Sequence, residues 1–231
     1  MTTPLSGRTI LVTGASRGIG AAIAGQLAGA GATVARIARS AMDPLDGARD
    51  FGADLTDAGQ RSAAFDAIER ELGLPHAVVS AAGAFMLAPL EETSDALLRE
   101  QLQINLEVPY AVARHFLPRM RRRGSGRHVL IGSIADLHAL PENSAYSASK
   151  FGARGVHEVL LEEYRGSGVH CTLVSPGPTD TTIWDPVDPD SREGFIPRGR
   201  MLRPQDVADA VAWILSLPAH VHVESLRLGP G

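Results

Sequence analysis

The sequence predicts an α/β fold in which a doubly wound parallel sheet of about seven strands carries helices on both faces. Two observations support this prediction. Short apolar runs alternate with longer helical patterns along the chain of 231 residues. The runs are apolar on both faces, which is typical of parallel strands buried between two layers of helices. The length fits a single domain, because one hydrophobic core can grow to about this size before a chain splits.

The elements are expected in alternating order. Apolar runs that are expected to form strands lie at 8–13, 33–38, 77–80, 127–131, 169–174 and 221–228. Helices are expected between them, at 19–30, 58–72, 96–123, 145–164 and 205–217. Residues 180–204 interrupt this order with prolines at 186, 189, 197 and 204 and with mixed charge. A long loop inside a compact domain usually binds a ligand or moves, so this loop is a candidate functional segment.

The composition excludes several classes of protein. Hydrophobic residues make up 44% and charged residues 21% of the chain, as in an ordinary globular protein. The net charge of −4 argues against a general nucleic-acid binder. The first residues lack a signal-peptide pattern, no apolar stretch approaches the roughly 18 residues of a membrane span, and the histidines show no metal-ligand spacing. With Cys171 as its one cysteine, the chain is expected to be cytoplasmic, with no membrane or nucleic-acid partner.

A glycine-rich turn, TGASRGIG at 13–20, follows the first expected strand. Gly14 permits a tight turn, Gly18 lets a pyrophosphate approach the backbone, and Gly20 lets helix and strand pack closely. Free amides and the dipole at the start of the following helix favour phosphate. A turn without a ligand is the alternative. Three glycines directly after the first strand of an α/β chain favour the nucleotide.

Tyr146 and Lys150 lie four residues apart on an expected helix, so both side chains share one face. A free phenol has a pKa of about 10 and is a poor base at neutral pH. A neighbouring ammonium favours the phenolate, so Tyr146 is a candidate to give and take a proton. Ser133 closes a strand thirteen residues earlier, where its hydroxyl can donate to an oxygen that gains negative charge. A Tyr–Lys pair alone occurs on many helices by chance, but together with Ser133 and the glycine turn it is specific.

Asn105 precedes Pro109 by four residues within the expected helix 96–123. Proline has no amide hydrogen, so the carbonyl of Asn105 loses its usual helical partner and is free to hold a water molecule. The alternative is that Pro109 only kinks the helix.

These motifs resemble those of the short-chain dehydrogenase/reductase family. The pattern T-G-x-x-x-G-x-G at 13–20 and the pattern Y-x-x-x-K at 146–150 occur in the family's order, and the resemblance covers essentially the whole chain. It implies a Rossmann-like domain, 1–231, that binds a dinucleotide and catalyses hydride transfer between nicotinamide and a carbonyl or alcohol carbon. It implies four catalytic residues: Asn105, Ser133, Tyr146 and Lys150. In this family the asparagine positions a water that links the lysine to solvent.

The resemblance also implies a cofactor site. In the family, a Pro-Gly motif such as Pro176-Gly177 holds the nicotinamide carboxamide, and Thr181 offers a hydroxyl. Ser80 stands where most relatives have an asparagine that braces the central strand, which puts that bracing in doubt. The implied cofactor-binding residues are Gly14, Ser16, Arg17, Gly18, Ile19, Gly20, Arg39, Asp54, Leu55, Ser80, Ala81, Gly83, Tyr146, Lys150, Pro176, Gly177, Thr179 and Thr181.

The second expected strand predicts NADP(H) as the cofactor. Ala38 stands where NAD-preferring relatives carry an aspartate, and Arg39 follows it. Together with Arg17, this arginine can bind a 2′-phosphate by charge and by bidentate hydrogen bonds. Two solvated arginines without a ligand are the alternative. Asp54 matches the family's aspartate beside the adenine amine, or it is a turn or N-cap carboxylate before the next helix.

The substrate is expected to be a small molecule. The residues expected to shape an apolar pocket are Phe85, Met86, Leu87, Leu137 and the loop with Trp184, whereas Asp136 and the charges of the loop leave polar substrates open. The loop 180–204 is expected to bind the substrate and to fold over it. Small residues keep one face of helix 145–164 flat, and in the family this helix forms a subunit interface. We therefore expect a homodimer or a homotetramer.

The leading functional hypothesis is an NADP(H)-dependent carbonyl reductase that also works as an alcohol dehydrogenase. One alternative is an NAD-linked alcohol dehydrogenase, which the two arginines disfavour. Another is a sensor or scaffold that binds NADP(H) without turnover. Such proteins tend to lose the tyrosine or the lysine, and this chain keeps both.

Overall fold

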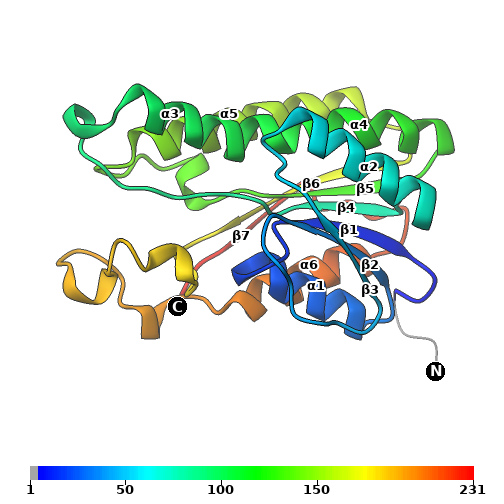
Figure 1. The fold of residues 1–231 in the computed structure, drawn as a ribbon, viewed down its shortest axis with the longest axis horizontal. Helices are drawn as coiled ribbons and strands as arrows, with labels where there is room; N and C mark the ends of the chain where they lie inside the picture. Colours follow the sequence, from blue (N-terminus) through cyan, green and yellow to red (C-terminus); the bar gives the residue numbers. More distant parts are fainter. Residues whose placement is uncertain (1–4) are drawn as a thin grey trace.

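The computed structural model describes residues 5–231, and its centre is a parallel sheet (Figure 1). Within these residues the sheet has seven strands in the order β3-β2-β1-β4-β5-β6-β7. The strands are β1 Thr9–Thr13, β2 Thr33–Ala38, β3 Ala48–Gly52, β4 Ala77–Ser80, β5 Gly126–Ile131, β6 Val169–Pro176 and β7 Ser225–Leu228. All neighbouring strands pair in parallel. The predicted doubly wound fold is confirmed, with the strand order reversing between β1 and β4.

Helices cover both faces of the sheet (Figure 1). They are α1 Gly18–Gly29, α2 Ala58–Leu72, α3 Asp95–Leu102, α4 Val108–Arg123, α5 Ser144–Glu163 and α6 Pro204–Ser216. Helices α1 and α6 lie on one face, and α2, α4 and α5 lie on the other. None of the helices within residues 5–231 has the length and apolar character that crossing a bilayer requires.

The alternation of side chains along β1 explains the two layers. Ile10 and Val12 pack into the core beneath α1 and α6, whereas Leu11 packs into the core beneath α2 and α4. Successive residues of a strand point to opposite faces, so a strand that is apolar at every position needs a helical layer on each side.

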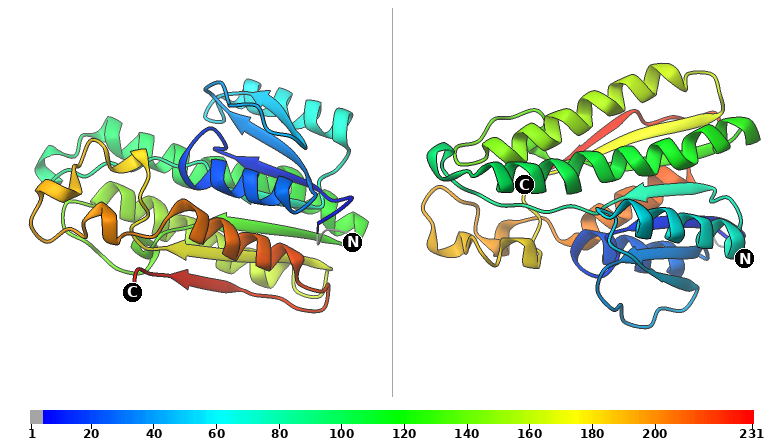
Figure 2. Two further views of the ribbon diagram at one scale, coloured as in Figure 1. Left: turned by 90° about the horizontal axis from the view of Figure 1, so that it is seen from below. Right: turned by 45° about the horizontal axis from the view of Figure 1, so that its top comes forward.

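The carboxyl ends of the strands meet at one end of the molecule (Figure 2). The loop 180–204 lies at this end, drawn in yellow and orange, and so does the segment 83–90 that leaves β4. Ligands of open parallel sheets bind outside the carboxyl ends of the strands, at the point where the strand order reverses. The fold therefore brings the glycine turn after β1 and the ends of β4, β5 and β6 to one crevice.

The structure differs from the sequence prediction in three elements. Strand β3 was not predicted, because only Phe51 is buried in this edge strand. The expected helix 96–123 is divided by a π-helical turn at Gln103–Glu107, in which the amide of Val108 donates to the carbonyl of Gln103. The last strand is shorter than the expected 221–228. The pattern of apolar residues along the sequence does not reveal an exposed edge strand, a π-helical turn or the exact start of a strand.

Candidate active site

The turn between β1 and α1 forms a cradle in which two glycines are required by space. Gly14 has a φ of +68°, and a Cβ on it would lie 2.6 Å from the Cα of Ala82. A Cβ on Gly20 would collide with the carbonyl oxygen of Gly14. The side chain of Arg17, the N-cap of α1, makes no capping hydrogen bond, and the first turn of the helix carries no acidic residue. The helix start therefore offers bare amide donors, which fits the phosphates of a dinucleotide.

The segment after β6 lies above this turn. A Cβ on Gly18 would lie 3.2 Å from the methyl group of Thr181. The amide of Gly177 donates to the carbonyl of Leu228 at 2.7 Å, and the hydroxyl of Thr179 donates to the carbonyl of Gly177 at 3.0 Å. The structure thus brings the glycine turn next to the segment that follows the Pro-Gly motif, at Gly18 and Thr181.

The segment that leaves β4 is held by the side chain of Thr13. The hydroxyl of Thr13 accepts hydrogen bonds from the amides of Ala81 (3.1 Å) and Ala82 (3.2 Å). The hydroxyl of Ser80 is turned toward β5, 3.2 Å from Nε2 of His128. A cofactor contact by Ser80 therefore has to come from its backbone. Thr13 therefore bonds the two residues that follow the strand, while the Ser80 side chain contacts β5.

Ser133, Tyr146 and Lys150 lie together at the end of β5. The hydroxyl of Ser133 accepts from the amide of Ala135 at 3.1 Å and lies near the Tyr146 phenol, whose pKa it lowers as a hydrogen-bonding neighbour. The amine of Lys150 lies 5.6 Å from the centre of the Tyr146 ring and donates to the carbonyl of Ile131 at 3.2 Å. Lys150 is only 6% exposed. Its charge therefore faces the phenol instead of bulk solvent.

The protonation of this set follows from burial. Burial raises the pKa of Tyr146 to about 12, although the hydrogen bond with Ser133 lowers it; the charge of Asp136 raises it further. Burial lowers the pKa of Lys150 to about 8, against the opposing effect of Asp136. The neighbouring ammonium was expected to favour the phenolate, but in the chain alone desolvation is the larger effect. At neutral pH the phenol is a proton donor.

Asn105 lies in the π-helical turn and is buried. Its side chain bonds both backbone groups of Ala84: it accepts from the amide at 3.1 Å and donates to the carbonyl at 2.9 Å. It also donates to the hydroxyl of Ser149 at 3.2 Å. A Cβ on Gly83 would lie 3.0 Å from Oδ1 of Asn105 and 4.0 Å from the amine of Lys150. Asn105 therefore ties the exit of β4 to α5 beside the lysine, a contact that the sequence did not indicate.

Charged residues mark the other end of the crevice, after β2. Ala38 is buried at the end of the strand, and Arg39 beyond it is exposed. The guanidinium of Arg39 lies 3.8 Å from the carboxylate of Asp54. Arg17 is exposed at the start of α1. Both arginines thus lie at the same edge of the sheet.

Asp54 is the carboxylate of a turn. It accepts hydrogen bonds from the amide (2.9 Å) and hydroxyl (2.7 Å) of Thr56, which hold the pKa of Asp54 below its usual value, with a smaller contribution from Arg39. The N-cap of α2 is Asp57, which accepts from the amide of Gln60. Leu55 between them is buried. Asp54 is therefore not the N-cap, and its place beside an adenine stays open.

Aromatic rings lie over the catalytic tyrosine. The ring centres of Phe85 and Tyr146 are 4.9 Å apart, and those of Phe85 and Trp184 are also 4.9 Å apart. Phe195 follows at 6.3 Å from Trp184. Asp136, in contrast, does not face this pocket, because it is buried and accepts a hydrogen bond from Ser175. Asp136 therefore gives no support to the expectation of polar substrates, which then depends on the charges of the loop 180–204.

Comparison with known proteins decides the family. The sequence profile of the short chain dehydrogenase family matches residues 8–192. The chain belongs to the short-chain dehydrogenase family. Its members are oxidoreductases, so the chain is an oxidoreductase of this type, as its motifs predict.

The similar members of the short-chain dehydrogenase family include proteins named as dehydrogenases and proteins named as reductases. A D-threitol dehydrogenase of Mycolicibacterium smegmatis is 37% identical, over 92% of this chain and 87% of that protein. The 3-oxoacyl-(acyl-carrier-protein) reductase MabA of Mycobacterium bovis is 32% identical over the same shares. An alcohol dehydrogenase structure from the archaeon Thermococcus sibiricus, complexed with 5-hydroxy-NADP, superposes with a TM-score of 0.83 at 27% identity, covering 96% of both chains. That ligand is of the cofactor class predicted from the sequence.

Within this short-chain dehydrogenase fold, the structure brings together most of the predicted site and adds residues that the sequence analysis missed. Phe195 was not singled out within the loop 180–204, and Asp136 was expected at the substrate pocket and not in a group with Ser175 and Arg154. Phe195 lies within a loop without periodicity, so no pattern marks it. Asp136 follows Ser133 by three residues, a capping-box spacing that indicates a local contact between the two.

Proposed function

We propose that this chain interconverts a carbonyl compound and a secondary alcohol with NADP(H), with Tyr146 as general acid and base. One observation carries the proposal. The Tyr146 phenol lies beside the hydroxyl of Ser133 and is flanked by a buried lysine amine, at the carboxyl end of a sheet whose first turn fits a phosphate. The non-catalytic alternative gives no reason to bury the charge of Lys150 beside a phenol.

The chain's own residues account for the proton. Because Ser133 Oγ accepts from the amide of Ala135, its hydrogen is available for a carbonyl oxygen that gains negative charge during reduction. Tyr146 donates its proton to the same oxygen, and in alcohol oxidation the phenolate takes the proton back. Lys150 lies beside the phenol, and the carbonyl of Asn105, freed by Pro109, is available to hold a water that exchanges protons with solvent. A bound NADP(H) would supply the hydride chemistry, as donor in reduction and as acceptor in oxidation.

The predicted cofactor residues fit a dinucleotide. The bare start of α1 and the glycine cradle fit a pyrophosphate, and Arg17 and Arg39 fit a 2′-phosphate. Ala38 adds no negative charge beside them, which favours NADP(H) over NAD(H). The Pro176–Thr181 segment, close to Gly18, would hold the nicotinamide end.

We assign the loop 180–204 to substrate binding. Within it, Arg192 reaches Glu142 at 2.7 Å, and Arg198 lies 3.2 Å from Asp180 and 2.5 Å from Asp185. These ion pairs hold Trp184 over Phe85 and thus over the catalytic tyrosine. Met86 and Leu137 are exposed nearby, on segments that the Ala88–Glu142 backbone hydrogen bond joins. Aromatic and aliphatic walls favour a substrate with an apolar or C–H-rich face.

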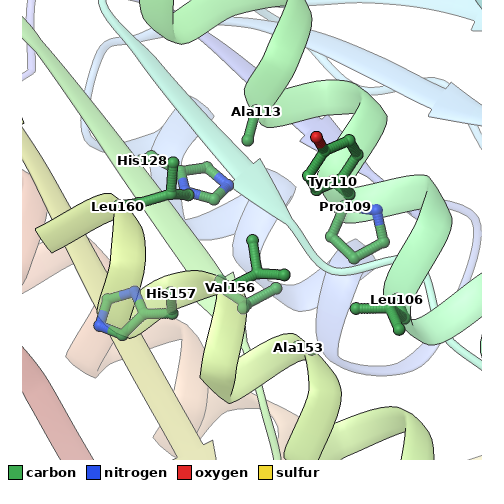
Figure 3. Close-up of a pocket in the computed structure, with 10 residues that line it drawn as sticks. Leu106, Pro109, Tyr110, Ala113, His128, Ala153, Val156, His157 and Leu160 are labelled. Carbon is green, nitrogen blue, oxygen red and sulfur yellow. The ribbon is translucent and has the colours of Figure 1, made fainter. Parts of the chain in front are cut away.

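We also propose a homodimer or homotetramer that assembles through α4 and α5. Tyr110, Phe151 and Val159 on these helices are exposed. A hollow lies between the helices (Figure 3), lined by Leu106, Pro109, Tyr110, Ala113, His128, Leu130, Ala153, Val156, His157 and Leu160. A second copy would cover these apolar side chains, so a monomeric mass by light scattering at micromolar concentration would contradict the assembly.

The cysteine content bears on the location of the protein. Cys171 is free and buried, which supports a reducing cytosolic location.

The decisive experiment follows NADPH absorbance with a panel of aldehydes and ketones. We expect turnover in the wild type and a loss of kcat on the order of 10²–10⁴-fold in Tyr146→Phe. The variant keeps the ring that packs against Phe85 and should bind NADPH normally, measured by fluorescence titration. Wild-type turnover in Tyr146→Phe would overturn the mechanism. NADPH binding without turnover of any substrate in the wild type would favour the sensor alternative.

A further inference from the structure

A buried carboxylate lies behind the catalytic set. Asp136 ends the short turn that Ser133 begins, and it is 1% exposed. Its Oδ2 accepts a hydrogen bond from Ser175 and lies 3.4 Å from the amide of Ser133. Its Oδ1 lies 3.5 Å from the guanidinium of Arg154 and makes no hydrogen bond within the described residues. A buried charge with an incomplete set of partners is costly, so its presence needs a reason.

The position of Asp136 connects three parts of the site. Ser133 is at the exit of β5, Ser175 is the residue before Pro176 in β6, and Arg154 lies one helical turn beyond Lys150 in α5. The chain makes room for the carboxylate at Gly132, where a Cβ would lie 2.6 Å from Oδ2. The hydrogen bond to the Ser133 amide fixes the residue whose hydroxyl meets the phenol.

The charges around Asp136 come from one side. The turn that contains Asp136 packs against α5 and β6. Helix α5 presents Tyr146, Lys150 and Arg154 to it, whereas β6 presents the uncharged Ser175. Arg154 is shared, since its other nitrogen lies 3.1 Å from Glu158, which is half exposed. The negative charge of Asp136 is therefore only partly neutralised by Arg154.

We propose that Asp136 is a positioning residue that fixes Ser133 and supplies the negative charge that keeps protons on the Tyr146–Lys150 pair, so that the site favours carbonyl reduction. This inference rests on the proposed function. A negative charge stabilises both protonated groups, and Asp136 accordingly raises the pKa of Tyr146 and of Lys150. A protonated phenol is the acid that reduction needs, whereas oxidation needs the phenolate.

The test uses three variants and pH profiles of kcat/KM in both directions. Asp136→Asn removes the charge and keeps the shape, so we expect the whole profile to move to lower pH by about half a unit to one unit. Arg154→Gln leaves the carboxylate unneutralised, so its profile should move to higher pH. Glu158→Gln removes the exposed partner that shares this arginine, so any movement of the profile should be small and in the direction of Asp136→Asn.

Opposite shifts from two neighbouring substitutions cannot arise from loosened packing. A purely structural role for Asp136 predicts a lower maximum with unmoved limbs, and that result would overturn the inference. Circular dichroism and thermal melting identify variants that fail to fold, and if Asp136→Asn fails, the upward shift in Arg154→Gln still decides. An inactive wild type would refute the proposed function instead, which is a separate outcome.

Discussion

The two ends of the crevice are built in different ways. At the catalytic end, Asn105, Lys150 and Asp136 are buried, and each is held by hydrogen bonds or ion pairs. At the end beyond β2, the side chain of Arg39 is 70% exposed, and its guanidinium lies 3.8 Å from the carboxylate of Asp54. Chemistry needs donors that are already in place when charge develops. Cofactor choice needs only the right sign of charge, which exposed side chains supply at little structural cost.

The largest effect is expected at the catalytic end, from Lys150→Met. Methionine fills similar space without the charge that faces the Tyr146 phenol. We expect kcat for carbonyl reduction to fall on the order of 10²–10⁴-fold in steady-state assays. Lys150→Arg is the control that keeps the charge with a different shape, and it should retain more activity. A Lys150→Met enzyme as fast as the wild type would mean that this end is not organised around the amine.

A smaller effect is expected at the exposed end, from Ala38→Asp combined with Arg39→Leu. The pair removes a donor to a 2′-phosphate and adds a carboxylate that repels it. Charge-assisted hydrogen bonds contribute about 1.5–3 kcal/mol each, so the ratio of kcat/KM for NADPH over NADH should fall about 10–100-fold. Thermal stability should barely change, because Arg39 is exposed. An unchanged ratio would show that these residues do not select the cofactor.

The smallest effect is expected from Asp54→Ala, which separates the two interpretations of this carboxylate. Its hydrogen bonds to Thr56 predict a loss of about 1 kcal/mol in the free energy of unfolding, measured in denaturant. Thr56→Val removes one of those bonds and keeps the carboxylate. If Asp54 also binds adenine, only Asp54→Ala will raise the KM for NADPH. Equal KM values in both variants would limit Asp54 to the turn.

The sequence was sufficient for the fold class and for the proximity of Tyr146 and Lys150, because both depend on patterns. Strands that are apolar on both faces require a covered parallel sheet, and the spacing of Tyr146 and Lys150 places them on one helix face. Strand β3 escaped this reasoning because its residues are mostly exposed and its place is set by pairing with β2 and by the Arg36–Asp50 ion pair.

Contacts between side chains that are distant in the sequence could not be predicted from it. Asn105 was expected to act through its backbone carbonyl, yet its side chain also holds Ala84, which lies 21 residues earlier. Asp136 was expected to face the substrate, but Ser175, 39 residues later, turns it inward. Such pairs share no periodicity, so only the folded chain reveals them.

The π-helical turn at Gln103–Glu107 has a consequence for how this site can change by insertion and deletion. A π turn has one more residue than an α-helical turn, and each residue of a helix is rotated by about 100° from the last. Deleting one residue here would restore an unbroken helix and swing the amide of Asn105 away from Ala84. This segment therefore cannot lose even one residue without losing the contact between Asn105 and Ala84, whereas surface loops are free to vary in length.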